Sequence, residues 1–150
     1  MSKSEPRGPD MAPSCNDSAR DVLVVDDDEN DVLLLRRAFQ KLGLPHRLTH
    51  ITDGQQAINY LQNISIAQHE PSLLLLDLKM PLLDGFDVLH WLQTSSKGGY
   101  IPVVVLSSSS LVRDKEKAQD LGAKDYVTKP YDMDELKLLV QALHDRWLRK

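Results

Sequence analysis

Five short apolar runs alternate with five segments of helical periodicity after residue 20, and this alternation constrains the fold most strongly. Three of the runs consist mainly of Val, Leu and Ile without polar alternation, which is typical of strands buried on both faces. The expected strands span residues 21–26, 46–51, 72–77, 101–107 and 124–129. The expected helices span residues 29–42, 55–63, 85–93, 110–121 and 132–147. The alternation predicts an α/β fold, a doubly wound five-stranded parallel sheet with helices on both faces.

Two of these elements carry more specific expectations. The run at 46–51 alternates only weakly, so we expect it near an edge of the sheet. His46 and His50 lie four residues apart on this strand, where that spacing gives no common helical face, so surface positions are expected for both. The buried face of the last helix should present Leu136, Leu139, Val140, Leu143 and Trp147.

Composition and charge restrict the class of protein. With 150 residues the chain favours one domain, and its net charge of −4 offers no basic surface for nucleic acid. No apolar run reaches the roughly 18–20 residues that a membrane-spanning helix needs. Cys15 is the single cysteine, so no disulfide within the chain is expected, which suits the reducing cytoplasm. Residues 1–20 are polar, and we expect a disordered tail before a folded domain of residues 21–150.

Carboxylates follow two of the expected strands. The run at 72–76 ends on Asp77, a charge that the interior of a buried strand would not tolerate. The first run ends on Asp26, Asp27 and Asp28. In parallel α/β sheets, sites form outside the carboxyl ends of the strands. If the first strand lies between the second and the third, Asp26, Asp27 and Asp77 converge and require a cation such as Mg²⁺.

The fourth and fifth expected strands end on a hydroxyl and a cation. Ser107 can donate a hydrogen bond to an oxyanion, and Lys129 supplies a positive charge just before Pro130. With Asp77 as a nucleophile, these groups predict chemistry on an anionic substrate beside a metal ion.

Each of these residues also has an ordinary structural interpretation. Asp28 or a neighbour can cap the helix that follows it. Ser107 can be one of four loop serines, another of which caps the next helix. Taken alone, Lys129 is a surface lysine and Tyr126 a core aromatic residue. Their combination, each at the correct end of a different strand, favours the functional interpretation.

Four motifs occur in the order and at the spacing of a known family. They are VLVVDDDEND, LLLLDLKMPLLDG, IPVVVLSSSS and LGAKDYVTKPYD. With them, residues 21–147 resemble the receiver domain of two-component response regulators. The segment at 61–71 and the region GGYIPVVVLSSS are most similar to single-domain regulators that partner bacterial phytochromes. The resemblance implies a flavodoxin-like sheet with strand order 2-1-3-4-5.

The resemblance implies a metal site at the first and third strands. Asp26 and Asp27 match the acidic pair that positions Mg²⁺, with Asp27 as the direct ligand. Asp77 matches the phosphoacceptor, which also contacts the metal. Lys79 matches the position that lends its backbone carbonyl to the metal. Asp28 departs from the asparagine often found there, which adds negative charge without removing a ligand.

The resemblance also implies roles at the fourth and fifth strands. Ser107 matches the hydroxyl that binds the phosphoryl group, and Lys129 matches the lysine that neutralises it. Tyr126 matches the aromatic switch residue, which fills the space that Ser107 leaves when it moves toward the phosphoryl group. A cis peptide bond is expected between Lys129 and Pro130.

The implied function is that of a single-domain response regulator without an output domain. A sensor histidine kinase, for which the resemblance suggests a bacteriophytochrome, would phosphorylate Asp77. The protein would catalyse only its own phosphorylation and dephosphorylation, and would signal to a downstream protein or a phosphotransfer protein. The helix at 110–121, the strand at 124–129 and the helix at 132–147 carry charges of both signs. They are expected to form a homodimer face, and a solvated surface is the alternative.

Two other function classes fit parts of the sequence. The pair Asp26 and Asp28 after a strand is also found in haloacid-dehalogenase-type phosphatases, which need a longer chain with a cap and would leave Asp77 without a role. A binding module with the same fold but without phosphorylation is the third interpretation, and the intact acidic set argues against it.

Overall fold

The computed structural model describes residues 19–64, 70–95 and 101–149. Of the expected tail at 1–20, only residues 19 and 20 are described. Cys15 and residues 65–69 lie outside the described residues. The described chain forms one parallel sheet of five strands: β2 (Asp21–Val25), β3 (Arg47–Ile51), β4 (Leu73–Leu76), β5 (Val103–Ser107) and β6 (Asp125–Thr128). Their order is β3-β2-β4-β5-β6, which confirms the predicted order 2-1-3-4-5.

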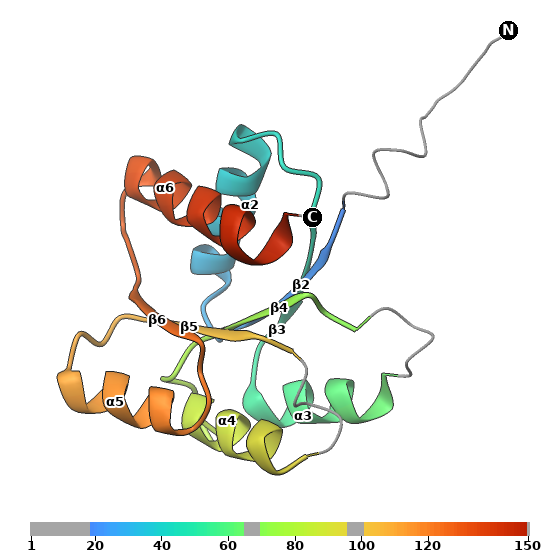
Figure 1. Cartoon of the computed structure of the whole chain (residues 1–150), viewed down its shortest axis with the longest axis vertical. Helices are drawn as coiled ribbons and strands as arrows, with labels where there is room; N and C mark the ends of the chain where they lie inside the picture. Colours follow the sequence, from blue (N-terminus) through green and yellow to red (C-terminus); the bar gives the residue numbers. More distant parts are fainter. Residues whose placement is uncertain (1–18, 65–69, 96–100, 150) are drawn as a thin grey trace, which may run out of the picture.

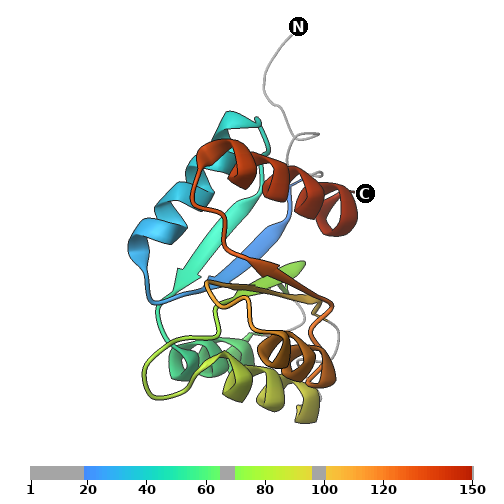
Figure 2. The same cartoon turned by 90° about the vertical axis from the view of Figure 1, so that its left-hand side faces the viewer.

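Five α-helices pack on the sheet: α2 (Glu29–Lys41), α3 (Gly54–Asn63), α4 (Gly85–Thr94), α5 (Val112–Asp120) and α6 (Met133–Leu143). Helices α2 and α6 lie on one face, and α3, α4 and α5 lie on the other (Figures 1 and 2). This is the predicted doubly wound arrangement. Within the described part of the chain, no helix has the length and apolar character needed to cross a membrane.

The inner strands β2, β4 and β5 are almost wholly apolar because both of their faces are covered. Val22 and Val24 of β2 pack into the cluster that includes residues of α2 and α6, whereas Leu23 and Val25 pack with residues of α3 and α4. Each fully buried Val or Leu side chain contributes about 1.5–3 kcal/mol relative to an exposed one. Strand β3, at the edge, alternates between exposed and half-buried residues before the buried Ile51, as its weak pattern predicted. The packed sheet thus fixes the backbone positions of the residues that follow its strands.

The last helix differs from its expected form. Helix α6 continues into a π-helical turn, η2 (His144–Leu148), in which the N–H of Arg149 donates to the carbonyl of His144 over 2.7 Å. A π-turn contains one extra residue, so it shifts the buried position along the chain. Leu148 is consequently 1% exposed, whereas Trp147, expected on the buried face, is only partly buried.

The expected surface position of His46 is wrong. This residue is 8% exposed, and its Nδ1 accepts a hydrogen bond from the backbone N–H of Arg20 over 3.0 Å. Its Nε2 lies 2.9 Å from Nδ1 of His144, so the start of β3 is joined to η2. His50 is half-buried, with Nε2 2.7 Å from the carbonyl oxygen of Asp26. The alternating pattern of the edge strand did not reveal that His46 would contact His144 or that His50 would contact the carbonyl of Asp26.

Candidate functional site

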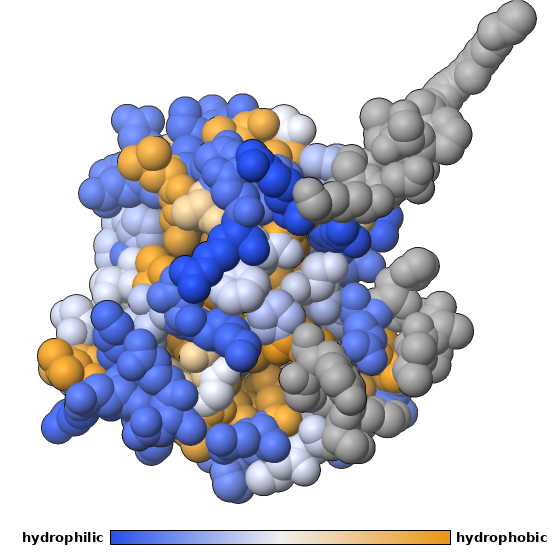
Figure 3. Space-filling model, viewed as in Figure 1, coloured by the Kyte–Doolittle hydropathy of each residue, from blue (hydrophilic) through white to orange (hydrophobic). Residues whose placement is uncertain are grey.

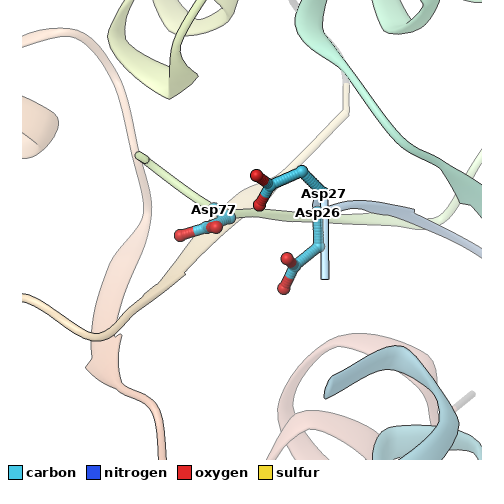
Figure 4. A group of neighbouring side chains, drawn as sticks. All are labelled: Asp26, Asp27 and Asp77. Atoms are coloured by element: carbon cyan, nitrogen blue, oxygen red, sulfur yellow. The ribbon is translucent and has the colours of Figure 1, made fainter. Parts of the chain in front are cut away.

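Three carboxylates meet where β2 and β4 end. Val25 and Leu76 are aligned in the sheet, so Asp26 and Asp77 each follow by one residue. The N–H of Asp77 donates to the carbonyl of Val25 over 2.9 Å, which continues the strand ladder to this point. Asp26, Asp27 and Asp77 each place a carboxylate oxygen within 4.8 Å of the others (Figure 4). Clustered carboxylate oxygens are the donor set that hard divalent cations prefer.

The carboxylates differ in burial. Asp26 is 5% exposed and Asp77 is 6% exposed, whereas Asp27 is exposed. Burial raises the pKa of Asp77 to about 6; the positive charge of Lys129 opposes this rise, and the negative charge of Asp26 adds to it. A cation between the carboxylates would favour their ionised forms. The predicted convergence of the three carboxylates is therefore realised, in a site that is short of positive charge.

Lys129 reaches the carboxylates from the end of β6. Its backbone N–H donates to the carbonyl of Ser107 over 2.7 Å, and its Nζ lies 2.8 Å from Asp26 Oδ2 and 3.6 Å from Asp77 Oδ2. Burial would lower the pKa of Lys129, but hydrogen bonds to Asp26 and to Asp31 more than compensate, so the pKa is raised. The ammonium therefore stays charged beside Asp77.

The expected cis peptide bond before Pro130 is wrong, because the described residues contain no cis peptide bond. The trans form is the intrinsically favoured one even before proline. With this trans bond, Lys129 still places its ammonium 2.8 Å from Asp26.

Asp28 has the ordinary structural role. Its side chain caps α2 by accepting hydrogen bonds from the N–H groups of Asn30 over 2.9 Å and Asp31 over 3.2 Å. The N–H of Asp28 in turn donates to Asp26 Oδ1 over 2.9 Å. The cap fixes the start of α2 directly beside the acidic cluster.

Gly85 allows the loop after Asp77 to fold back closely. A Cβ atom at this position would lie 2.4 Å from the carbonyl oxygen of Asp77 and 2.8 Å from Cα of Leu78. The N–H of Gly85 donates to the carbonyl of Leu78 over 3.0 Å. Only glycine permits this approach, which packs the start of α4 against the backbone of the acidic site.

Ser107 and Tyr126 are joined through Ser109. Ser107 is fully buried, and its Oγ accepts a hydrogen bond from the N–H of Ser109 over 3.1 Å. The hydroxyl of Tyr126 donates to the carbonyl of Ser109 over 2.7 Å. Ser109 Oγ donates to Asp114 Oδ2 over 2.6 Å. The N-cap position of α5 is Leu111, which makes no side-chain capping bond, so the N-cap residue is not a serine. The residues predicted as hydroxyl and switch are therefore both tied to one loop residue.

Lys79 is exposed, and its backbone N–H lies 3.4 Å from Asp77 Oδ1. The expected contribution of its carbonyl to a metal ion stays a prediction.

Asp31 was missed by the sequence reasoning. Its Oδ2 lies 2.8 Å from Nζ of Lys129, as close as the oxygen of Asp26. An acidic residue in the first turn of a helix is common because it interacts favourably with the helix dipole, so Asp31 carried no distinguishing signal.

Comparison with known proteins agrees with this arrangement. The model of the response regulator receiver domain family matches residues 22–141. The "Probable methanogenesis regulatory protein FilR2" of Methanothrix harundinacea is 34% identical over 128 residues, which are 85% of this chain and 83% of that protein. The transcriptional regulator RpaA of Synechocystis is also 34% identical, over 81% of this chain, but the chain spans only 48% of its length.

Solved structures are similar over most of their length. The Mn²⁺-bound form of the response regulator Rcp1 has a TM-score of 0.75 and 30% identity, covering 86% of this chain and 94% of that one. The phosphorylated cyanobacterial phytochrome response regulator RcpA has a TM-score of 0.77 and 32% identity, covering 87% and 94%. From the family match and these relatives, the chain belongs to the response regulator receiver domain family.

Proposed function

We propose that the protein accepts a phosphoryl group on Asp77 from the phosphohistidine of a sensor histidine kinase and changes conformation to signal to a partner protein. The observation that carries this proposal is the position of the Asp77 carboxylate, which combines three features. It is buried at a strand end, it lies in a carboxylate cluster, and it is 3.6 Å from the ammonium of Lys129.

The carboxylate cluster fits Mg²⁺. Asp26, Asp27 and Asp77 would hold the ion with their side-chain oxygens, and Lys79 would add its backbone carbonyl. When bound, the ion supplies positive charge beside the phosphoryl oxygens. The similar response regulator Rcp1 has a Mn²⁺-bound form, which supports the proposal that this chain binds a divalent cation.

The chemical step is a transfer between two nucleophiles. An Asp77 carboxylate oxygen attacks phosphorus in line, the P–O bond forms, and the P–N bond of the phosphohistidine breaks. The electron pair of that bond returns to the imidazole nitrogen. Lys129 neutralises charge on the phosphoryl oxygens, and Ser107 donates its hydroxyl to one of them. Positioning and electrostatics therefore supply most of the catalysis, and the protein acts on itself alone.

The acyl phosphate adds about two negative charges where Ser107 and Lys129 meet. Because the Oγ of Ser107 accepts from Ser109, moving that hydroxyl would pull on the loop that also holds Tyr126. The proposed output is a repacking of α5, β6 and α6, read by a downstream protein or a phosphotransfer protein. A second copy of this chain could bind the same face. Likeness to the phytochrome response regulator RcpA supports a bacteriophytochrome as the kinase.

Labelling with radioactive acetyl phosphate and Mg²⁺ tests the proposal. We expect one phosphate per chain, acid-stable and base-labile as an acyl phosphate, lost in Asp77→Asn and kept in the control Asp87→Asn. Continuous turnover of acetyl phosphate without labelling would indicate a phosphatase. Neither labelling nor turnover would indicate a binding module.

A further inference from the structure

We propose that Asp31 is a positioning residue for phosphoryl transfer, because it holds the ammonium of Lys129 in the orientation that serves Asp77. This inference rests on the proposed phosphorylation of Asp77. It adds to that chemistry a carboxylate from a helix, outside the strand ends where the other site residues lie.

The contact is short and sheltered. Nζ of Lys129 donates to Asp31 Oδ2 over 2.8 Å, and the Lys129 side chain is only 10% exposed. The Asp31 side chain is 27% exposed, so this pair is less screened by water than a surface ion pair. Asp31 lies on the first turn of α2, next to the buried Val32, and its N–H donates to the capping Asp28. The carboxylate therefore extends from a fixed part of the backbone.

The number of donors on the ammonium explains what the contact does. A lysine ammonium carries three N–H groups, which rotate freely unless acceptors fix them. Asp26 and Asp31 lie 2.8 Å from Nζ and take two of these donors. Asp77 Oδ2, at 3.6 Å, is beyond hydrogen-bond length. The third donor is thus left for the phosphoryl oxygens that arrive at Asp77.

The surroundings of Lys129 explain why the position of its ammonium depends on Asp31. A small cavity beside Lys129, Asp26 and Asp31 is otherwise lined by apolar side chains, among them Val24 and Leu35. If Asp31 were shortened, the ammonium would keep Asp26 but would face apolar groups on the side of α2. It would then reorient toward Asp77 or water.

An ordinary role in the helix dipole is the alternative for Asp31. Glu29 offers a matched control, because it is an acidic residue in the same first turn and is exposed. Glu29→Ala removes the same charge from the same helix end but leaves the ion pairs of Lys129 with Asp26 and Asp31 in place.

The test compares the wild type with Asp31→Ala, Asp31→Asn and Glu29→Ala, after thermal unfolding has shown that each variant is folded. The rate of labelling by acetyl phosphate in Mg²⁺ is measured. We expect Asp31→Ala to be about tenfold slower, because small misplacements of a catalytic group cost rate steeply. Asp31→Asn keeps a side-chain oxygen that accepts from Lys129, so it should retain most of the rate, and Glu29→Ala should match the wild type.

A second measurement does not depend on labelling. In ¹⁵N NMR spectra, the Lys129 ammonium signal should be slow in hydrogen exchange in the wild type and Asp31→Asn, and lost to fast exchange in Asp31→Ala. Equal labelling rates for Asp31→Ala and the wild type, or equal slowing in Asp31→Ala and Glu29→Ala, would overturn the role of Asp31. Failure to label the wild type would instead remove the proposed function. The ammonium signal would still report whether Asp31 holds Lys129.

Discussion

The hydroxyl of Tyr126 donates to the carbonyl of Ser109 over 2.7 Å, and this bond ties a buried aromatic ring to the loop that follows Ser107. Tyr126→Phe removes the donor and leaves the carbonyl in a buried position. We expect a loss of about 1 kcal/mol in the free energy of unfolding, measured by urea denaturation. Tyr131→Phe is the matched control, because Tyr131 is 73% exposed. Equal stabilities for the two variants would contradict the expected contribution of this bond.

Magnesium should stabilise the fold. Asp26, Asp27 and Asp77 repel one another without a cation, and an ion bound only by the native state adds stability by mass action. At a hundredfold excess over the dissociation constant the gain is about 2.7 kcal/mol, seen as a rise in melting temperature. Asp27→Ala should abolish this rise, while Asp28→Asn, which changes the helix cap, should keep it. An unchanged melting temperature of the wild type would argue against the metal site.

Acid should weaken the fold through His46. Burial lowers the pKa of His46 from its usual 6.5, and the nearby charges of His144 and Arg20 lower it further. The unfolded chain therefore binds more protons than the folded one, and the free energy of unfolding falls as the pH drops below about 6.5. Burial raises the pKa of Asp77 to about 6, so Asp77 has the opposite effect. As the pH falls through this value, the folded chain takes up more protons at Asp77 than the unfolded chain, and the free energy of unfolding rises.

Urea unfolding at several pH values around 6.5, compared between the wild type and His46→Gln, isolates the histidine contribution, because Asp77 titrates in both proteins. His46→Gln should flatten the pH dependence in this range, whereas the control His90→Gln, at an exposed position, should leave it unchanged. A His46→Gln protein with the full pH dependence would show that His46 is not its source.

Lys79 should prolong the life of the phosphoryl group. In receiver domains, the side chains two residues after the phosphoacceptor and two after the hydroxyl residue flank the path of the attacking water. Here these residues are Lys79 and Ser109. Lys79 offers no proton acceptor, and Ser109 Oγ is engaged by Asp114. Lys79→Asn should therefore lose phosphate faster than the wild type in the same Mg²⁺ buffer. Equal or faster loss from the wild type would mean that the exposed side chain only points to solvent.

Self-association should tighten on phosphorylation. The outer side of α5 is largely hydrophilic (Figure 3), with Arg113, Lys115 and Glu116 among its charges. Some neighbouring charges already have partners within the chain, such as Asp125 with Arg146 at 3.7 Å. We therefore expect a weak dimer. Sedimentation of the phosphorylated and unphosphorylated forms measures it, and a monomer in both states would refute the shared face.

The strand ends were predictable because a buried parallel strand admits few interpretations. Four consecutive leucines followed by Asp77 imply an edge where polar groups begin, and parallel register then aligns Asp77 with Asp26. Each of these inferences depends on local pattern and on a general rule of topology.

Features that depend on distant partners were not predictable in the same way. Asp31 contacts Lys129, which lies 98 residues away, and His46 contacts His144 across the same separation of 98 residues. The extra residue in η2 places Leu148 in the core, a position that the helical period of the sequence did not indicate. No local pattern encodes such contacts, and the resemblance wrongly implied the cis bond before Pro130.

The link between His46 and His144 lies at the beginning of β3, whereas the acidic cluster lies where the strands finish. The histidine contribution to acid sensitivity and the proposed reaction chemistry therefore lie at opposite edges of the sheet. Substitutions at the histidine edge should change how the stability of the fold depends on pH. The charge pattern that a phosphorylated partner meets at the other edge would stay as it is.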